Sequence, residues 1–144
     1  MSKVLHNFDR DMEDIVRFRI VCNYLSDAFE VAENLKSNHD FNNCCQILDE
    51  KDYIFEDRDK PHRALHFVLE VHLRNFPRKV ELQIMTLLQE AWDKKDHNLI
   101  YEKIRIGRKI DKKDTIKMRS MSDLLYVADE FFDSLRTKIL TSTL

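Results

Sequence analysis

The stretch Val80-Glu81-Leu82-Gln83-Ile84-Met85-Thr86 sets Val80, Leu82 and Ile84 in alternation with Glu81, Gln83 and Met85. This period of two predicts a strand with one face on the core. From Thr86 the spacing becomes helical, through Leu88, Ala91, Trp92, Leu99 and Ile104. Gly107 suits the end of that helix because glycine is favoured just after a helical C-terminus.

The segment before this strand has the same alternation. In the segment from residue 63 to residue 73 the odd positions from Leu65 onward are apolar, whereas the even positions include His66, Glu70 and His72. A turn over residues 74–77 then predicts an antiparallel hairpin. In that hairpin Glu81 and Gln83 share a polar sheet face with His66, Glu70 or His72.

The rest of the chain supplies further strands and helices. Residues 16–22 alternate as a half-buried strand, and Ser26 is the expected N-cap of a helix that carries Ala28, Phe29, Ala32 and Leu35 on one stripe. Residues 45–48 and 53–55 are weaker strand candidates. At the C-terminus a long amphipathic helix is predicted from apolar residues at three- and four-residue steps, and such a helix commonly covers its own sheet. Those residues are Met121, Leu124, Leu125, Ala128, Phe131, Phe132, Leu135 and Ile139.

These elements predict one α+β domain over residues 1–144, with a mixed, largely antiparallel sheet flanked by helices and a long C-terminal helix. The single glycine and two prolines leave few positions for an internal linker. The balance of 24 basic and 26 acidic side chains gives no reason to expect a nucleic-acid or membrane partner, and leaves room for a local basic patch. Three cysteines without metal-like spacing favour a reduced, cytoplasmic setting, and no apolar run reaches the length of a membrane span.

The polar sheet face is the candidate site. Glu70 and Glu81 lie there beside histidines, and Asp14 comes just before the first strand. Carboxylates on a rigid sheet suit Mg²⁺, which prefers oxygen ligands and often accompanies phosphates. Nearby cations suited to phosphate oxygens are Arg17, Arg19, Lys60 and Arg63. The alternative is an ordinary solvated strand face.

His62 and His66 invite a second interpretation, because two histidines four residues apart can share a metal ion on a helix. On an extended strand they would lie about 13 Å apart, too far for one ion. The strand prediction therefore argues against a shared metal.

Several segments, in order, resemble the synthetase domain of RelA/SpoT-type proteins. Residues 80–86, followed by Trp92 and His97, are similar to the family's Glu-x-Gln-Ile-Arg-Thr strand and the helix after it. Residues 14–21 resemble its first strand, residues 52–54 its Asp-Tyr-Ile strand, and residues 63–66 the end of its Gly-Tyr-Arg-Ser-x-His segment.

The resemblance implies a nucleotidyltransferase-like fold that transfers the β,γ-pyrophosphate of ATP to the 3′-hydroxyl of GDP or GTP. It implies Mg²⁺ held by Asp14 and Glu81, with Glu81 as ligand or general base and both residues catalytic. Trp92 and His97 would brace the site. The nucleotide pocket would then include Arg19, His62, Arg63, His66 and Gln83.

The sequence also departs from the family pattern. Arg17 replaces a glycine, Pro61-His62 replaces Gly-Tyr and so removes the ring that stacks on guanine, and Met85 replaces an arginine. About a dozen residues precede Asp14, and they do not reproduce the family's ATP-gripping cations. The cluster Arg105, Arg108, Lys109, Lys112 and Lys113 is a candidate substitute, although a charge run is commonly a solvated surface.

Three interpretations remain open at this level. The first is a divergent pyrophosphokinase that acts on ATP and GDP or GTP. The second is a catalytically inactive domain that binds a nucleotide, an alarmone or a protein partner. The third is a homo-oligomeric structural protein that pairs through its C-terminal helix.

Overall fold

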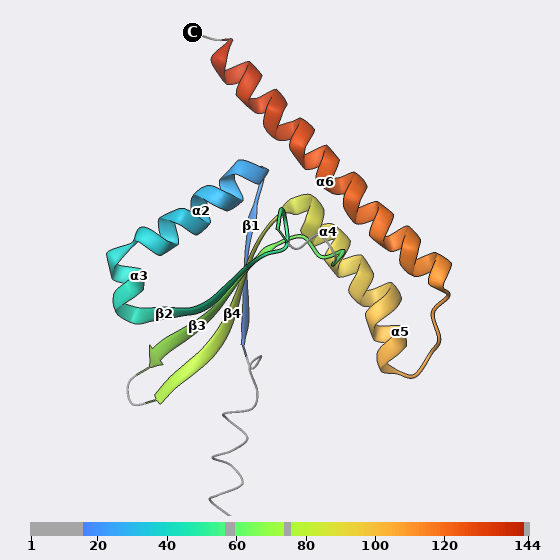
Figure 1. Cartoon of the computed structure of the whole chain (residues 1–144), viewed down its shortest axis with the longest axis horizontal. Helices are drawn as coiled ribbons and strands as arrows, with labels where there is room; N and C mark the ends of the chain where they lie inside the picture. The colour runs from blue at the N-terminus through green and yellow to red at the C-terminus, as the bar shows by residue number, and fades with distance from the viewer. Residues whose placement is uncertain (1–15, 57–59, 74–75, 143–144) are drawn as a thin grey trace, which may run out of the picture.

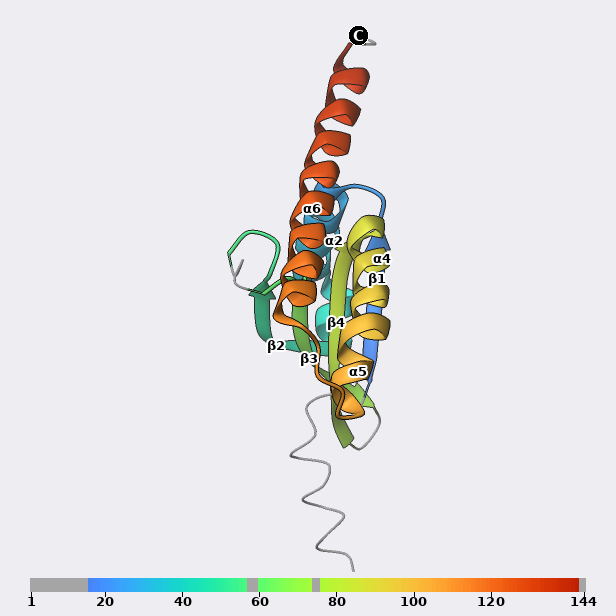
Figure 2. The ribbon, with the colours of Figure 1, turned by 90° about the vertical axis from the view of Figure 1, so that its right-hand side faces the viewer.

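A four-stranded sheet organises the computed structural model, which describes residues 16–56, 60–73 and 76–142. The strands are β1 (Arg17–Cys22), β2 (Cys45–Asp52), β3 (Leu65–Leu73) and β4 (Phe76–Thr86). Their order is β1-β4-β3-β2, visible in Figure 2. β1 runs parallel to β4, while β3 is antiparallel to both β4 and β2. The predicted mixed, largely antiparallel sheet and the β3–β4 hairpin are therefore confirmed.

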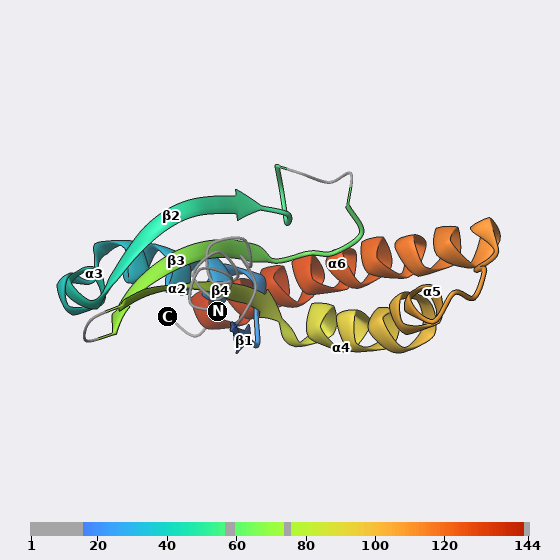
Figure 3. The same ribbon diagram turned by 90° about the horizontal axis from the view of Figure 1, so that it is seen from below.

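Helices cover the sheet and extend beyond it. They are α2 (Leu25–Ser37), α3 (His39–Cys44), α4 (Leu87–Asp96), the π-helical turn η1 (His97–Tyr101), α5 (Glu102–Arg105) and α6 (Lys112–Thr141). α2 lies along the sheet (Figure 1). Figures 1 and 3 show α4 and α6 side by side, and Figures 1 and 2 show the C-terminal part of α6 projecting past the sheet.

The hydrophobic core lies between α2 and one face of the sheet. Ala28 and Ala32 of α2 are fully or almost fully buried in one cluster with Phe67, Leu82 and Ile84. These strand residues occupy alternate positions, as the period-two pattern predicts. The other face therefore carries Glu81 and Gln83.

Thr86 marks the change from strand to helix. Its hydroxyl accepts a hydrogen bond from the Gln89 backbone N–H at 3.3 Å, which caps α4, and donates one to the buried Asp129 of α6 at 2.6 Å. Gly107 follows α5 with φ of 79°, a left-handed conformation that glycine adopts without a steric penalty. Both predicted helix boundaries are confirmed.

Two local predictions are wrong. Ser26 does not cap α2, whose N-cap is Tyr24, because the Ser26 hydroxyl instead donates to Asp133 of α6 at 2.6 Å. Residues 53–55 form a turn rather than a strand. Asp52 Oδ1 accepts hydrogen bonds from the backbone N–H groups of Ile54 and Phe55, and this local pairing replaces sheet hydrogen bonds.

The C-terminal helix forms as predicted, but its apolar stripe does not cover the sheet. Phe131 is 72% exposed and Leu124 63%, whereas the buried residues of α6 are Ser122, Tyr126 and Asp129. The reason is that α6 packs beside α4 through polar partners and then runs past the sheet. In the described ranges, no helix has both the length and the apolar character for a bilayer crossing.

Candidate functional site

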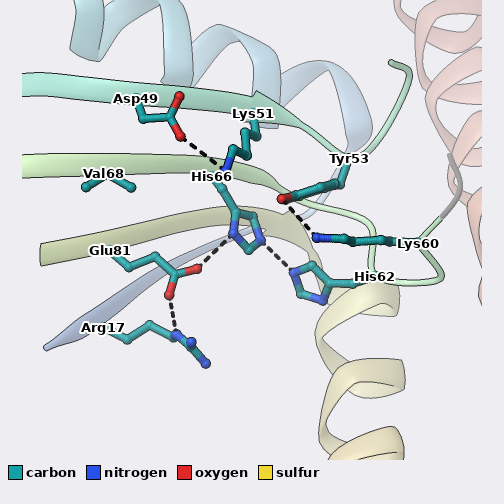
Figure 4. Close-up of a pocket in the computed structure, with 9 residues that line it drawn as sticks. All are labelled: Arg17, Asp49, Lys51, Tyr53, Lys60, His62, His66, Val68 and Glu81. Atoms are coloured by element: carbon teal, nitrogen blue, oxygen red, sulfur yellow. Dashed lines mark hydrogen bonds and ion pairs between the residues drawn. The ribbon is translucent and has the colours of Figure 1, made fainter. Parts of the chain in front are cut away.

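A pocket of about 310 Å³ opens on the polar face of the sheet (Figure 4). Side chains from all four strands or their ends contribute to it, together with the loop before β3. The lining residues are Arg17, Asp49, Lys51, Tyr53, Lys60, His62, His66, Val68 and Glu81. The pocket therefore combines cations, aromatic rings and a buried carboxylate in one place.

Glu81 is the buried carboxylate of this pocket and is 8% exposed. Arg17 Nε donates to its Oε2 at 2.8 Å, and Gln83 Nε2 donates to its Oε1 at 2.9 Å. His66 Nδ1 lies 2.8 Å from the same Oε1. The register explains the arrangement, because Arg17 pairs with Glu81 and His66 pairs with Gln83 across neighbouring strands. Three donors from three strands fix the orientation of this carboxylate.

The two histidines are in contact, contrary to the sequence-based separation of about 13 Å for an extended strand. His62 Nε2 lies 2.8 Å from His66 Nε2. The expectation was wrong because β3 begins at Leu65, so His62 belongs to the preceding loop and folds back over the strand.

Helix α6 holds this loop on both sides of His62. Ser122 donates a hydrogen bond to the Pro61 carbonyl, and Arg63 Nη2 donates to Asp123 Oδ1 at 2.7 Å. Two anchors that flank one residue restrict its backbone. The position of His62 in the pocket is thus determined by a helix about 60 residues later in the chain.

Asp93 of α4 completes the site, and the sequence analysis missed it. His62 Nδ1 lies 3.1 Å from Asp93 Oδ1, and Arg19 Nη2 donates to Asp93 Oδ2 at 2.7 Å and to Gln83 Oε1 at 2.9 Å. Asp93 belongs to none of the matched motifs. The only hint in the sequence was that Asp93 lies in the helix predicted to begin after Thr86.

Burial and neighbouring charges shift the pKa values of two side chains in the site. Burial and, after it, the electrostatic effect of His62 lower the pKa of His66 to about 4, against the opposing effect of Glu81. Burial raises the pKa of Asp93, but hydrogen bonds and charges from His62 and Arg19 outweigh it and lower that pKa to about 2. His66 is therefore neutral and Asp93 ionised at pH 7.

The Asp93 shift predicts a pH-dependent contribution to stability. A folded pKa of about 2, below the ordinary 3.8, means that the contribution is complete above pH 3.8 and is lost as the pH falls towards 2. We expect Asp93→Asn to lower the free energy of unfolding by about 1–2 kcal/mol at pH 6, allowing for solvent screening, and by much less near pH 2.5.

Urea unfolding at several pH values measures this difference. Asp114→Asn is the matched control, because Asp114 is an exposed carboxylate of α6 that pairs with Lys117 on the surface. Its effect should stay near zero throughout. An Asp93→Asn difference that is the same at pH 6 and pH 2.5 would contradict the assignment.

The other predicted site residues have separate positions. The Arg63 side chain is buried under α6, donates also to the Tyr53 carbonyl at 3.3 Å, and does not line the pocket. Asp14 lies outside the described residues. His97 lies exposed beside Tyr101, so it does not brace the site. Trp92 is buried and donates from Nε1 to the Met118 carbonyl at 2.7 Å, which ties α4 to α6.

Tyr53 forms an aromatic wall of the pocket that the sequence analysis did not assign. Its ring meets the His66 ring edge-on, with 4.8 Å between the centroids. The Lys60 ammonium group lies 4.8 Å from the centre of the Tyr53 ring. A cation above an aromatic face is a favourable electrostatic contact, so Tyr53 keeps a positive charge at the mouth of the pocket.

A metal site is not assembled from the described side chains alone. Among them, no group of three or more His, Cys, Asp or Glu residues is arranged to hold an ion. Mg²⁺, however, is commonly bound through one or two carboxylates together with phosphates and water. Glu81 fits such a role as one hard oxygen ligand.

Comparison with known proteins agrees with the fold and the motifs. Residues 2–105 match the model described as the region found in RelA / SpoT proteins. Two proteins of Bacillus subtilis (strain 168) are similar, each at 28% identity. GTP pyrophosphokinase YwaC aligns over 83% of this chain and 55% of its own length, and GTP pyrophosphokinase YjbM over 94% and 62%. The chain thus spans between half and two thirds of these curated relatives.

Solved structures show the same architecture. The structure of small alarmone synthetase 1 from Bacillus subtilis bound to its product pppGpp superimposes with a TM-score of 0.79 at 28% identity, covering 94% of this chain and 67% of that one. A GTP pyrophosphokinase family protein from Streptococcus pneumoniae shares the fold, with a TM-score of 0.79 at 21% identity, covering 99% of this chain and 73% of that one. With its family model matched over residues 2–105, the chain belongs to the RelA/SpoT family.

Proposed function

We propose that this domain transfers the β,γ-pyrophosphate of ATP to the 3′-hydroxyl of GDP or GTP, with Glu81 as the general base. The observation that carries the proposal is the position of Glu81, which is buried at a pocket and oriented by three donors. A base must reach the hydroxyl proton within hydrogen-bond distance, and a fixed carboxylate at a pocket meets that need. Relatives named GTP pyrophosphokinases support this assignment.

The cations of the pocket suit the phosphates of such substrates. Arg17, Lys51 and Lys60 all line it. Transfer of a phosphoryl-type group depends on positioning and on charge stabilisation, both of which cations supply. We assign His66 to the nucleotide pocket and Arg19 and Gln83 to its shape, whereas the contacts of Arg63 favour a packing role.

Mg²⁺ would be held by Glu81 and Asp14. When bound, it would supply positive charge that neutralises the phosphates. The chain's own residues orient Glu81, since Arg17, Gln83 and His66 all donate to its carboxylate.

A cytoplasmic setting is part of the proposal. Cys44 and Cys45 are adjacent in the chain, and neither they nor Cys22 form a disulfide. Free thiols are typical of a reducing compartment.

The test of the function is a transfer assay. Purified protein is incubated with labelled ATP, Mg²⁺ and either GDP or GTP, and the product is separated by chromatography. We expect label on the guanine nucleotide. Absence of transfer to GDP and GTP would overturn the proposal.

A catalytically inactive, nucleotide-binding domain is the second candidate, and one contact favours it. Arg17 stands where the family pattern has glycine, and its Nε donates to Glu81 at 2.8 Å. The Arg17 guanidinium would then compete with the substrate hydroxyl for the Glu81 carboxylate. Calorimetry with ATP, GDP, GTP and ppGpp detects binding whether or not transfer occurs.

Arg17 gives a prediction that applies to either candidate. If this half-exposed guanidinium binds phosphate, Arg17→Ala should weaken ATP binding by about 10- to 100-fold, the value of a hydrogen bond to a charged group. Calorimetry measures the affinity, with Lys117→Ala as control because Lys117 pairs with Asp114 on the surface of α6 and does not line the pocket. Tighter ATP binding by Arg17→Ala would show that Arg17 obstructs the pocket.

A homo-oligomer or another protein partner stays a prediction. Its support is the exposed apolar side chains on α6, among them Leu124, Phe131 and Leu135. Large exposed apolar patches commonly mark interaction sites. Light scattering of the purified chain tests self-association.

A further inference from the structure

Six side chains of the site form a closed ring of hydrogen bonds. Starting from Glu81, the ring passes through Gln83, Arg19, Asp93, His62 and His66 and returns to Glu81. Its members come from β1, β3, β4, α4 and the loop before β3. Figure 4 shows the section from His62 through His66 to Glu81. Such a ring couples the helix α4 to the carboxylate at the pocket.

The donors in the histidine section can be assigned from the partners. Asp93 and Glu81, as carboxylates, only accept, so His62 Nδ1–H donates to Asp93 and His66 Nδ1–H donates to Glu81. The contact between the two Nε2 atoms at 2.8 Å needs a third N–H, supplied by one of the two rings. Three N–H groups on two rings mean that one of the two rings carries a proton on both of its nitrogens.

We propose that His62 and Asp93 are positioning residues, which act through His66 to hold its Nδ1–H on the carboxylate of Glu81. In this proposal the third N–H belongs to His62, which donates to His66 Nε2 and keeps that nitrogen without a proton of its own. Asp93 fixes the His62 ring from the other side. This inference rests on the proposed role of Glu81 and gives His62 a different duty from the guanine-stacking tyrosine of the family pattern.

The surroundings of His62 support this duty. Both of its ring nitrogens are engaged, and its side chain is only 21% exposed. The anchors on Pro61 and Arg63 hold its backbone to α6. A histidine whose backbone is anchored and whose two ring nitrogens are both engaged is suited to orient a neighbouring side chain.

The decisive measurement is the tautomer of His66, read by ¹H–¹⁵N correlation NMR of the imidazole groups. In the wild-type protein we expect a proton on His66 Nδ1 and none on Nε2. His62→Phe keeps a flat ring but removes both donors, so His66 should gain a population with the proton on Nε2. His66→Gln identifies the signals, and circular dichroism verifies that each variant folds.

Rescue and control variants separate positioning from loss of packing. His62→Gln places an amide N–H near the former Nε2 and should restore the Nδ1–H tautomer of His66. His72→Phe removes an exposed histidine from the far end of β3 and should leave the His66 signals unchanged. An Nε2–H tautomer in the wild type, or a His66 tautomer unaffected in His62→Phe, would overturn the proposal.

Kinetics supply a second readout. His62→Phe should lower kcat for pyrophosphate transfer by about 10- to 100-fold with little change in KM for the acceptor, because orientation of the base is lost while a flat ring is kept. Raised KM with unchanged kcat would overturn the positioning role in favour of nucleotide contact. If the wild type shows no transfer, the proposed function fails, and the NMR result still decides the hydrogen-bond chain.

Discussion

Replacing Glu81 with glutamine is expected to lower the rate of pyrophosphate transfer by about 10²- to 10⁴-fold, the usual contribution of a general base. The amide has nearly the shape of the carboxylate but cannot accept the proton of the 3′-hydroxyl. Its NH₂ group would also face a donor, because Arg17, Gln83 and His66 all donate to Glu81. The loss should therefore appear in kcat as well as in kcat/KM.

The matched control is Glu70→Gln, which changes a carboxylate on the same face of the sheet. Glu70 pairs with Lys79 across the strands and does not line the pocket. Labelled-ATP assays of both variants, at equal concentrations of folded protein, make the comparison. Transfer by Glu81→Gln within threefold of wild type, or an equal loss in Glu70→Gln, would remove Glu81 from the role of base.

Replacing Trp92 with alanine is expected to lower the free energy of unfolding by about 3–5 kcal/mol, the usual cost of removing a large buried aromatic side chain. Trp92 is 4% exposed and joins α4 to α6 through its hydrogen bond to the Met118 carbonyl. Trp92→Phe keeps most of the packing and loses the hydrogen bond, so it should cost about 1–3 kcal/mol. The difference between the variants separates packing from hydrogen bonding.

Circular dichroism in a urea titration is the suitable measurement, because Trp92 is the single tryptophan and its fluorescence disappears in both variants. Phe131→Ala is the control, since Phe131 is an aromatic residue of α6 that is 72% exposed. We expect Phe131→Ala to change stability by less than about 0.5 kcal/mol if the chain is monomeric. Equal costs for Trp92→Ala and Phe131→Ala would contradict the anchoring role of Trp92.

The β3–β4 hairpin and the helix after it could be predicted from local patterns. Alternation of Val80, Leu82 and Ile84 predicts the core face, and the same pattern places Glu81 and Gln83 opposite. Thr86 and Gly107 mark the ends of the helical region through local backbone chemistry. These predictions succeed because periodicity and capping depend on residues close together in the chain.

The apolar stripe of the C-terminal helix shows where this reasoning stops. The spacing of Leu124, Phe131 and Leu135 predicts a helix, and the helix is present. Which face it buries depends on where α4 leaves room, and the contacts with α4 and α2 place Tyr126 and Asp129 inside instead. The spacing of apolar residues along a helix does not show which other element packs against its apolar face.

The sequence by itself determined the strand that carries Glu81, the hairpin that brings His66 beside it, and the family to which the motifs belong. Only the tertiary structure decided that His62 contacts His66 and that Asp93 closes the ring of hydrogen bonds. It also decided that Arg63 binds Asp123 of α6 and does not line the pocket. The physical reason is distance along the chain. The register of the β3–β4 hairpin follows from residues close together in the chain, whereas the loop at His62 is held by Ser122 and Asp123, far away in the sequence.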